Sequence, residues 1–186
     1  HNLDQLRTII GTTRRLCVTV KANAYGHGVE VVLRALQEGR VDMLGVAAIR
    51  EAQQLRDLGW RRPILLLGSE LSMYEGPQKR QLAHWLVAND VRVSITRAED
   101  VEALATASCY LRQPAIVHAM LDTGMGRMGL DEESLLKLLE QVRDSQKIEL
   151  EGLYTHFATA DDSNQTFARE QLKRFEAFRL RLKGLG

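Results

Sequence analysis

The sequence predicts a parallel α/β fold built from repeated strand–helix units. Short apolar runs alternate with amphipathic segments at a spacing of roughly 25 residues. Several of these runs are almost continuously apolar, which is typical of parallel strands covered on both faces. Between them, apolar residues recur with the period of an α-helix. Six such units in series indicate a parallel sheet with helices packed against it.

The expected strands are short, as parallel strands usually are. The first contains Cys17, whose thiol we expect to be buried as a small apolar group. His118 lies within the fifth strand, where we expect a hydrogen-bonded core residue and not a metal ligand. The six expected strands are Leu16–Val20, Met43–Ala47, Ile64–Leu67, Val91–Ile95, Ile116–Leu121 and Ile148–Thr155.

Each expected helix carries one apolar stripe that should dock on the sheet. Asp131, followed by two glutamates, predicts the start of one helix, because carboxylates favour the positive end of the helix dipole. The four stripes comprise Val29, Val32, Leu33 and Leu36; Leu82, Trp85 and Leu86; Leu135, Leu138, Leu139 and Val142; and Ala168, Leu172, Phe175, Phe178 and Leu182.

Two architectures fit this pattern, a doubly wound open sheet and a (β/α)8 barrel of TIM type. The number of strands does not decide between them, because a barrel without its last two units has the same pattern. A complete barrel needs about 250 residues, and this chain has 186. No Pro/Gly/Ser-rich linker divides the chain, so we expect residues 1–186 to form one domain.

Composition excludes several classes of function. The formal net charge is +1, whereas nucleic-acid binding needs a clustered basic surplus. No run of about 18 apolar residues is present, so we expect no membrane span. Two distant cysteines fit a reduced, cytoplasmic protein, and no metal-ligand spacing occurs. The chain begins at His1 without an initiating methionine, and we expect a piece of a longer protein.

Three chemically useful side chains follow strands of the expected sheet. Lys21 follows the first strand, Arg127 lies after the fifth, and His156 closes the sixth. The carboxyl ends of parallel strands meet at one edge, so these groups should share a site. Partial desolvation of Lys21 at an apolar strand end would favour its neutral, nucleophilic amine. Residues 20–28 (Val-Lys-Ala-Asn-Ala-Tyr-Gly-His-Gly) also offer the Tyr25 hydroxyl and glycines that admit an anion.

Residues 121–129 read Leu-Asp-Thr-Gly-Met-Gly-Arg-Met-Gly and contain a G-x-G-x-x-G pattern. That pattern is typical of dinucleotide binding, but there it belongs to the first strand–helix turn of its fold. Here it follows the fifth strand and places an arginine between the glycines. We therefore interpret the match as fortuitous, and uptake of NAD by the protein would contradict that interpretation.

Three segments carry a resemblance to a known family. Residues 20–28 resemble the pyridoxal-phosphate (PLP) attachment signature of alanine racemases, and residues 121–129 resemble the second signature of that family. Residues 154–158 (Tyr-Thr-His-Phe-Ala) are similar to a third, shorter stretch. The resemblance implies the N-terminal (β/α)8 barrel of a fold-type III PLP enzyme, with about six of its eight units present. In that family a mostly β domain follows, and the enzyme is a head-to-tail homodimer.

The resemblance also implies a reaction, the interconversion of L- and D-alanine for peptidoglycan precursors. By position, Lys21 would bind the cofactor covalently and then act as one of two catalytic bases. Tyr25 would contact the cofactor phosphate, and His156 would line the cofactor ring. Arg127 would lie near the PLP phenolic oxygen and would bind the substrate carboxylate. No metal ion is implied.

The sequence departs from the family in two respects. The family's C-terminal β domain and the tyrosine it supplies as second base are absent from this chain, so we expect the isolated fragment to be inactive. Met120 also replaces a CO₂-modified lysine that braces the arginine in many members. Two alternatives stay open: a racemase of the same fold with another or broader amino-acid specificity, and a non-catalytic PLP-binding barrel protein.

Overall fold

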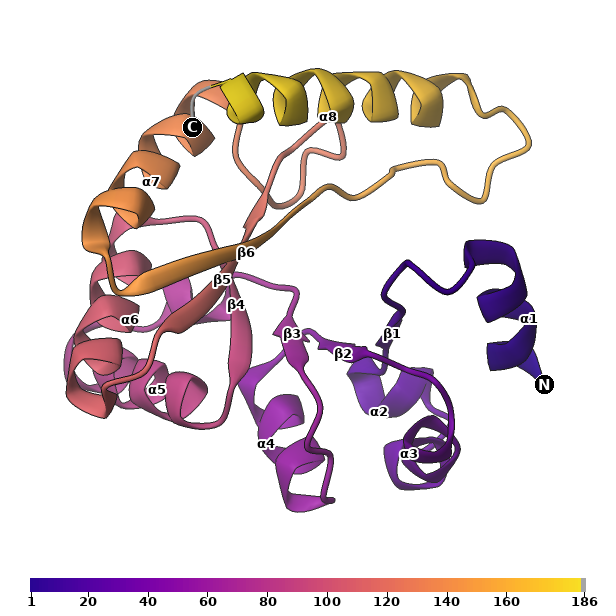
Figure 1. Ribbon diagram of the computed structural model, residues 1–186, viewed down its shortest axis with the longest axis horizontal. Coiled ribbons are helices and arrows are strands. Elements are labelled where there is room, and N and C mark those ends of the chain that lie inside the picture. Colours follow the sequence, from indigo (N-terminus) through magenta and orange to yellow (C-terminus); the bar gives the residue numbers. More distant parts are fainter. Residues whose placement is uncertain (185–186) are drawn as a thin grey trace.

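The computed structural model describes residues 1–184 and contains one six-stranded parallel sheet. Strand order along the sheet is the same as strand order along the chain, and every pair of neighbours is parallel. A doubly wound sheet would reverse its order at a switch point. The order observed here continues in one direction, so the sheet curves as an incomplete barrel with helices along its outer side (Figure 1).

All six expected strands form, each ending within two residues of its expected bounds. The strands are β1 (Cys17–Thr19), β2 (Met43–Val46), β3 (Ile64–Leu66), β4 (Val91–Ile95), β5 (Ala115–Met120) and β6 (Ile148–Tyr154).

Helices separate the strands. The expected start at Asp131 is confirmed, because its side chain accepts a hydrogen bond from the Ser134 backbone N–H at 2.9 Å. Across residues 1–184, no helix has the length and apolar character to cross a bilayer. The helices are α1 (Asn2–Ile10), α2 (Lys21–Tyr25), α3 (Val29–Glu38), α4 (Ile49–Asp57), the 3-10 helix η1 (Glu70–Met73), α5 (Gly76–Ala88), α6 (Ala98–Leu111), α7 (Glu132–Ser145) and α8 (Thr166–Gly184).

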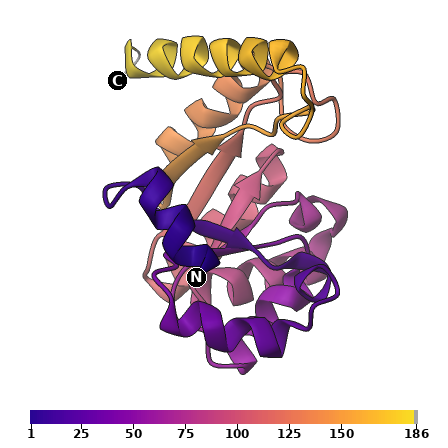
Figure 2. The same ribbon diagram turned by 90° about the vertical axis from the view of Figure 1, so that its right-hand side faces the viewer.

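The core lies between the sheet and the helices outside it. Leu44, Ile64 and Leu66 are fully buried there, and the predicted stripe of α3 packs on them through Leu33 and Leu36. A second, smaller cluster contains Ala119, Leu121, Leu135 and Phe178, and it docks α7 and α8 on the end of β5. Figure 2 shows α8 across one end of the row of helices, with α3 at the other end.

The concave face of the sheet is polar along β4, β5 and β6. The Tyr154 hydroxyl lies 2.7 Å from the Ser94 hydroxyl and donates to the Leu67 carbonyl at 3.0 Å, so it spans β5. Nearby, Glu151 accepts from Arg92 at 3.1 Å and contacts the His118 ring at 3.0 Å. The expectation of a hydrogen-bonded His118 is therefore confirmed.

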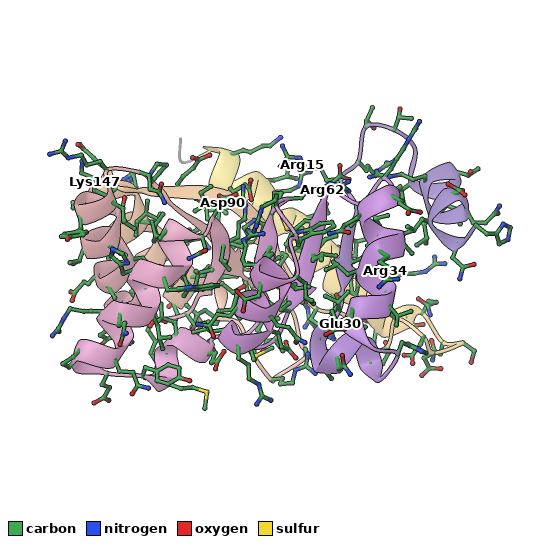
Figure 3. All side chains as sticks on the ribbon, turned by 90° about the horizontal axis from the view of Figure 1, so that it is seen from below. Arg15, Glu30, Arg34, Arg62, Asp90 and Lys147 are labelled. Atoms are coloured by element: carbon green, nitrogen blue, oxygen red, sulfur yellow. The ribbon has the colours of Figure 1, made fainter. Side chains whose placement is uncertain are left out.

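Strand direction decides where functional groups gather. In Figure 3 the labelled residues Arg15, Arg62, Asp90 and Lys147, which all precede strands, lie along one side of the sheet. Glu30, at the start of α3, lies farther toward the opposite side, where the strands end. The site residues that follow β1, β5 and β6 therefore share that opposite side.

Two sequence expectations about burial are wrong. Cys17 is exposed because β1 is an edge strand in the described residues and has a neighbour on one side only. Leu172 is 47% exposed, although the apolar stripe of α8 placed it against the protein. The neighbouring Gln171 is completely buried instead, because this part of α8 lies on polar loops and not on the sheet.

Candidate active site

Lys21, Arg127 and His156 converge at the carboxyl ends of the strands. Lys21 begins α2 directly after β1, Arg127 lies in the loop between β5 and α7, and His156 follows β6. The pKa of His156 lies below its usual 6.5, because partial burial disfavours the charged ring and the charges of Arg127 and Lys21 repel it. The structure therefore places these three groups within electrostatic reach of one another.

The backbone after Lys21 turns in the left-handed sense. Ala22, Asn23, Ala24 and Tyr25 have φ values of 51°, 55°, 56° and 54°. L-residues in this conformation each cost about 1–2 kcal/mol, because Cβ crowds the following carbonyl oxygen. Such strain persists only where surrounding contacts hold it, and it is concentrated at functional sites.

Two kinds of contact hold the left-handed turn. Within the segment, the Ala24 N–H donates to the Val20 carbonyl at 2.9 Å. The Asn23 side chain accepts from the Val29 N–H at 2.8 Å and so ties the turn to the start of α3. The turn thus leads the chain directly from β1 into the first long helix, with Lys21 at its beginning.

Glu51 on α4 anchors the turn from the neighbouring unit. One carboxylate oxygen accepts from the Ala22 N–H at 2.7 Å. The other accepts from the Ala47 and Ala48 N–H groups at 2.8 and 3.1 Å, at the start of α4. One carboxylate therefore fixes the residue after Lys21 relative to the end of β2. Sequence reasoning missed Glu51, whose only signal is its place three residues into an expected strand–helix junction.

Tyr25 lies beside Lys21 but faces outward. The Lys21 Nζ is 5.9 Å from the centroid of the Tyr25 ring, and the tyrosine is 61% exposed. Among residues 1–184, no carboxylate forms an ion pair with Lys21 or with Arg127. Both cations are therefore free to meet an anionic ligand from solvent.

The loop that carries Arg127 is closed at its base. The Asp122 N–H donates to the Leu130 carbonyl at 2.8 Å, and the Leu130 N–H donates to the Met120 carbonyl at 3.0 Å. Gly129 has φ 96°, and a Cβ there would lie 3.0 Å from the Asp122 nitrogen, so the closure requires glycine. The glycines of this segment therefore shape a loop with Arg127 exposed near its tip.

The other candidate residues lie apart from this cluster. Met120 is buried at the end of β5, where its carbonyl helps to close the loop of Arg127. His84 stacks edge-on against Tyr110 at 5.4 Å between ring centroids, as a packing residue on α5. Residues 1–184 contain no group of three or more His, Cys, Asp or Glu side chains placed to hold a metal ion.

The fold and the cluster of Lys21, Arg127 and His156 together define a domain of the parallel α/β-barrel type, with these side chains on the carboxyl rim. A family model described as "Alanine racemase, N-terminal domain" matches residues 1–186. The alanine racemase of Desulforamulus reducens is 39% identical over 188 residues, covering 100% of this chain and 48% of that protein. The chain thus belongs to the alanine racemase N-terminal domain family, and the resemblance expected from the sequence is confirmed.

Solved structures agree in fold. The alanine racemase of Clostridium difficile 630 in complex with cycloserine matches with a TM-score of 0.87 and 29% identity, over 100% of this chain and 49% of that one. A histidine racemase from Leuconostoc mesenteroides matches with a TM-score of 0.82 and 25% identity, over 95% and 45%. The chain spans about half the length of the curated relatives it matches. Alanine racemases are PLP-dependent isomerases, so the family agrees with the expected cofactor.

Proposed function

We propose that this chain is the cofactor-binding, N-terminal half of a PLP-dependent alanine racemase, with Lys21 as the residue that holds the cofactor. The observation that carries the proposal is the convergence of Lys21, Arg127 and His156 at the strand ends, with neither cation paired to a carboxylate of residues 1–184. A site with two free cations suits a ligand that brings a phosphate and a carboxylate.

The residues present fit PLP in three respects. The Lys21 amine is unpaired and partly exposed, so an aldehyde from solvent can reach it. The exposed hydroxyl of Tyr25 is available to donate to a phosphate oxygen. His156 has a lowered pKa and so presents a neutral ring near pH 7, which can lie against an aromatic cofactor without adding charge.

Each residue then has a task in racemisation. PLP, when bound, withdraws electrons from the α-carbon of an attached amino acid and so makes its proton acidic. The Lys21 amine would take that proton at Nζ or return it. The Arg127 guanidinium pairs with the substrate carboxylate and fixes which bond faces the lysine.

Inversion needs a second acid/base group on the opposite side of the α-carbon. We propose that a tyrosine outside residues 1–186, in a β domain of the partner subunit, supplies it. The working enzyme would then be a cytoplasmic homodimer that provides D-alanine for peptidoglycan. On this proposal, the 186 residues alone do not racemise alanine efficiently.

The test is made with the intact protein and a panel of L-amino acids that includes alanine, serine, lysine and histidine. We expect D-alanine to form fastest, and Lys21→Ala to abolish it while Lys137→Ala, on the exposed side of α7, does not. Faster racemisation of histidine would favour the second candidate, which the similarity to the histidine racemase supports. PLP binding with no racemisation of any amino acid would favour the non-catalytic barrel protein.

A further inference from the structure

Gln171 on α8 is a fully buried polar residue that the proposed chemistry does not use. A primary amide has two N–H donors and one carbonyl acceptor, and its burial costs free energy unless these groups find partners. An apolar side chain at this position would pack on α8 without that cost. We therefore look for the role of this glutamine in the segments that its hydrogen bonds connect.

The Gln171 amide bonds to two different loops. Its Nε2 donates to the Thr123 hydroxyl at 3.0 Å, in the β5–α7 loop that carries Arg127. The same Nε2 donates to the His156 carbonyl at 3.1 Å, and Oε1 accepts from the Ala158 N–H at 2.9 Å. Figure 1 shows the β5–α7 loop passing beneath α8, in agreement with these contacts.

Two threonine hydroxyls extend the hydrogen bonds of Gln171 into a chain in which each group donates to the next. The Thr155 hydroxyl has a single proton, which it donates to the Leu121 carbonyl at 2.8 Å. The Thr123 hydroxyl, 2.8 Å from the Thr155 hydroxyl, must then donate to it and accept from Gln171. Each donor has one acceptor in this order, so the orientation of the amide is defined. Arg174, one turn further along α8, donates to the Thr123 carbonyl at 2.9 Å.

We propose that Gln171 is a positioning residue that holds the loop of Arg127 and the segment of His156 in register with each other. It is completely buried and acts through the Thr123 side chain and the backbone of His156 and Ala158, so it does not touch a bound ligand. Its effect on cofactor binding rests on the proposed function, whereas its effect on the relative placement of the two loops does not.

A purely structural glutamine would stabilise the fold without setting the environment of His156. The two cases differ in the pKa of His156, which burial lowers and which the charges of Arg127 and Lys21 lower further. These two cations face the imidazole from the β5–α7 loop and from the end of β1. Loosening the Gln171 contacts would let the ring move away from them, and its pKa would rise towards 6.5.

The experiment measures the pKa of His156 by NMR in the intact protein without added PLP, with His156→Gln to assign the signal. We expect Gln171→Met and Thr123→Val to raise this pKa. Thr123→Ser keeps the hydroxyl and should retain the wild-type value, which is the rescue that a hydrogen-bond role requires. Thr123→Val also keeps the proposal testable if Gln171→Met does not fold.

Ser108→Ala is the matched control. Ser108 is buried on α6, and its single hydroxyl proton is shared between the Gln113 and Lys147 carbonyls, at the ends of β5 and β6 that lie away from the site. We expect it to lower stability without moving the pKa of His156. The proposal is overturned if Gln171→Met and Thr123→Val lower stability but leave that pKa at the wild-type value. Covalent trapping of PLP on Lys21 tests the proposed function separately.

Discussion

Replacing Ala22 by glycine should stabilise this protein, although glycine in a helical segment usually destabilises. Ala22 is exposed and has φ 51° and ψ 50°, so its side chain contributes strain and little packing. Relief of the left-handed strain is worth about 1–2 kcal/mol. The greater freedom of glycine in the unfolded chain costs roughly 0.5–1 kcal/mol. The net expectation is a gain of about 0.5–1 kcal/mol in the free energy of unfolding.

The assay is urea unfolding of the intact protein, compared with Ala35→Gly as a matched control. Ala35 is an exposed alanine inside the right-handed helix α3, where glycine should lose about 1 kcal/mol. The same substitution is thus expected to act in opposite directions at two sites in adjacent helices. If Ala22→Gly destabilises the protein as much as Ala35→Gly does, the result contradicts the left-handed conformation of Ala22.

Three further outcomes follow from the contacts described above. Glu51→Ala removes the acceptor of three backbone N–H groups and should lower the free energy of unfolding by about 2 kcal/mol; an unchanged urea midpoint would contradict the anchoring role. Asp100→Ala leaves the buried Lys79 without its partner at 2.7 Å and should cost about 3–5 kcal/mol, more than replacing both residues by apolar ones. The pKa of His156 should lie below 6.5, so the contribution of its neutral ring to the free energy of unfolding is full above pH 6.5 and is lost as the pH falls through the lowered pKa. Arg127→Gln should raise this pKa in an NMR titration.

The strands could be predicted because burial in a parallel sheet leaves a direct trace in the sequence. Runs such as Met43–Val46, Ile64–Leu66 and Val91–Ile95 are buried along their whole length. The concave face departs from this apolar pattern. There Arg92 pairs with Glu151, and the Ser94 hydroxyl pairs with that of Tyr154. Such cross-strand partners are visible only once the sheet has formed.

The common location of Lys21, Arg127 and His156 could be predicted from the sequence, whereas the residues that hold them in place could not. Lys21, Arg127 and His156 each follow a strand, and strand direction alone brings them to one side. The left-handed turn could not be predicted, because alanine and tyrosine disfavour this conformation and only Asn23 among its four residues tolerates it. Gln171 was missed because a helical stripe assigns burial by apolar character, whereas this face of α8 covers polar loops. Leu172 was expected to be buried for the same reason.

Covalent trapping of the cofactor tests the central claim most directly. The intact protein would be incubated with PLP, reduced with borohydride, digested, and mapped by mass spectrometry. The account predicts a pyridoxyl group on Lys21, and none in Lys21→Ala. A modified lysine elsewhere in the chain, or unchanged labelling in that variant, would contradict it.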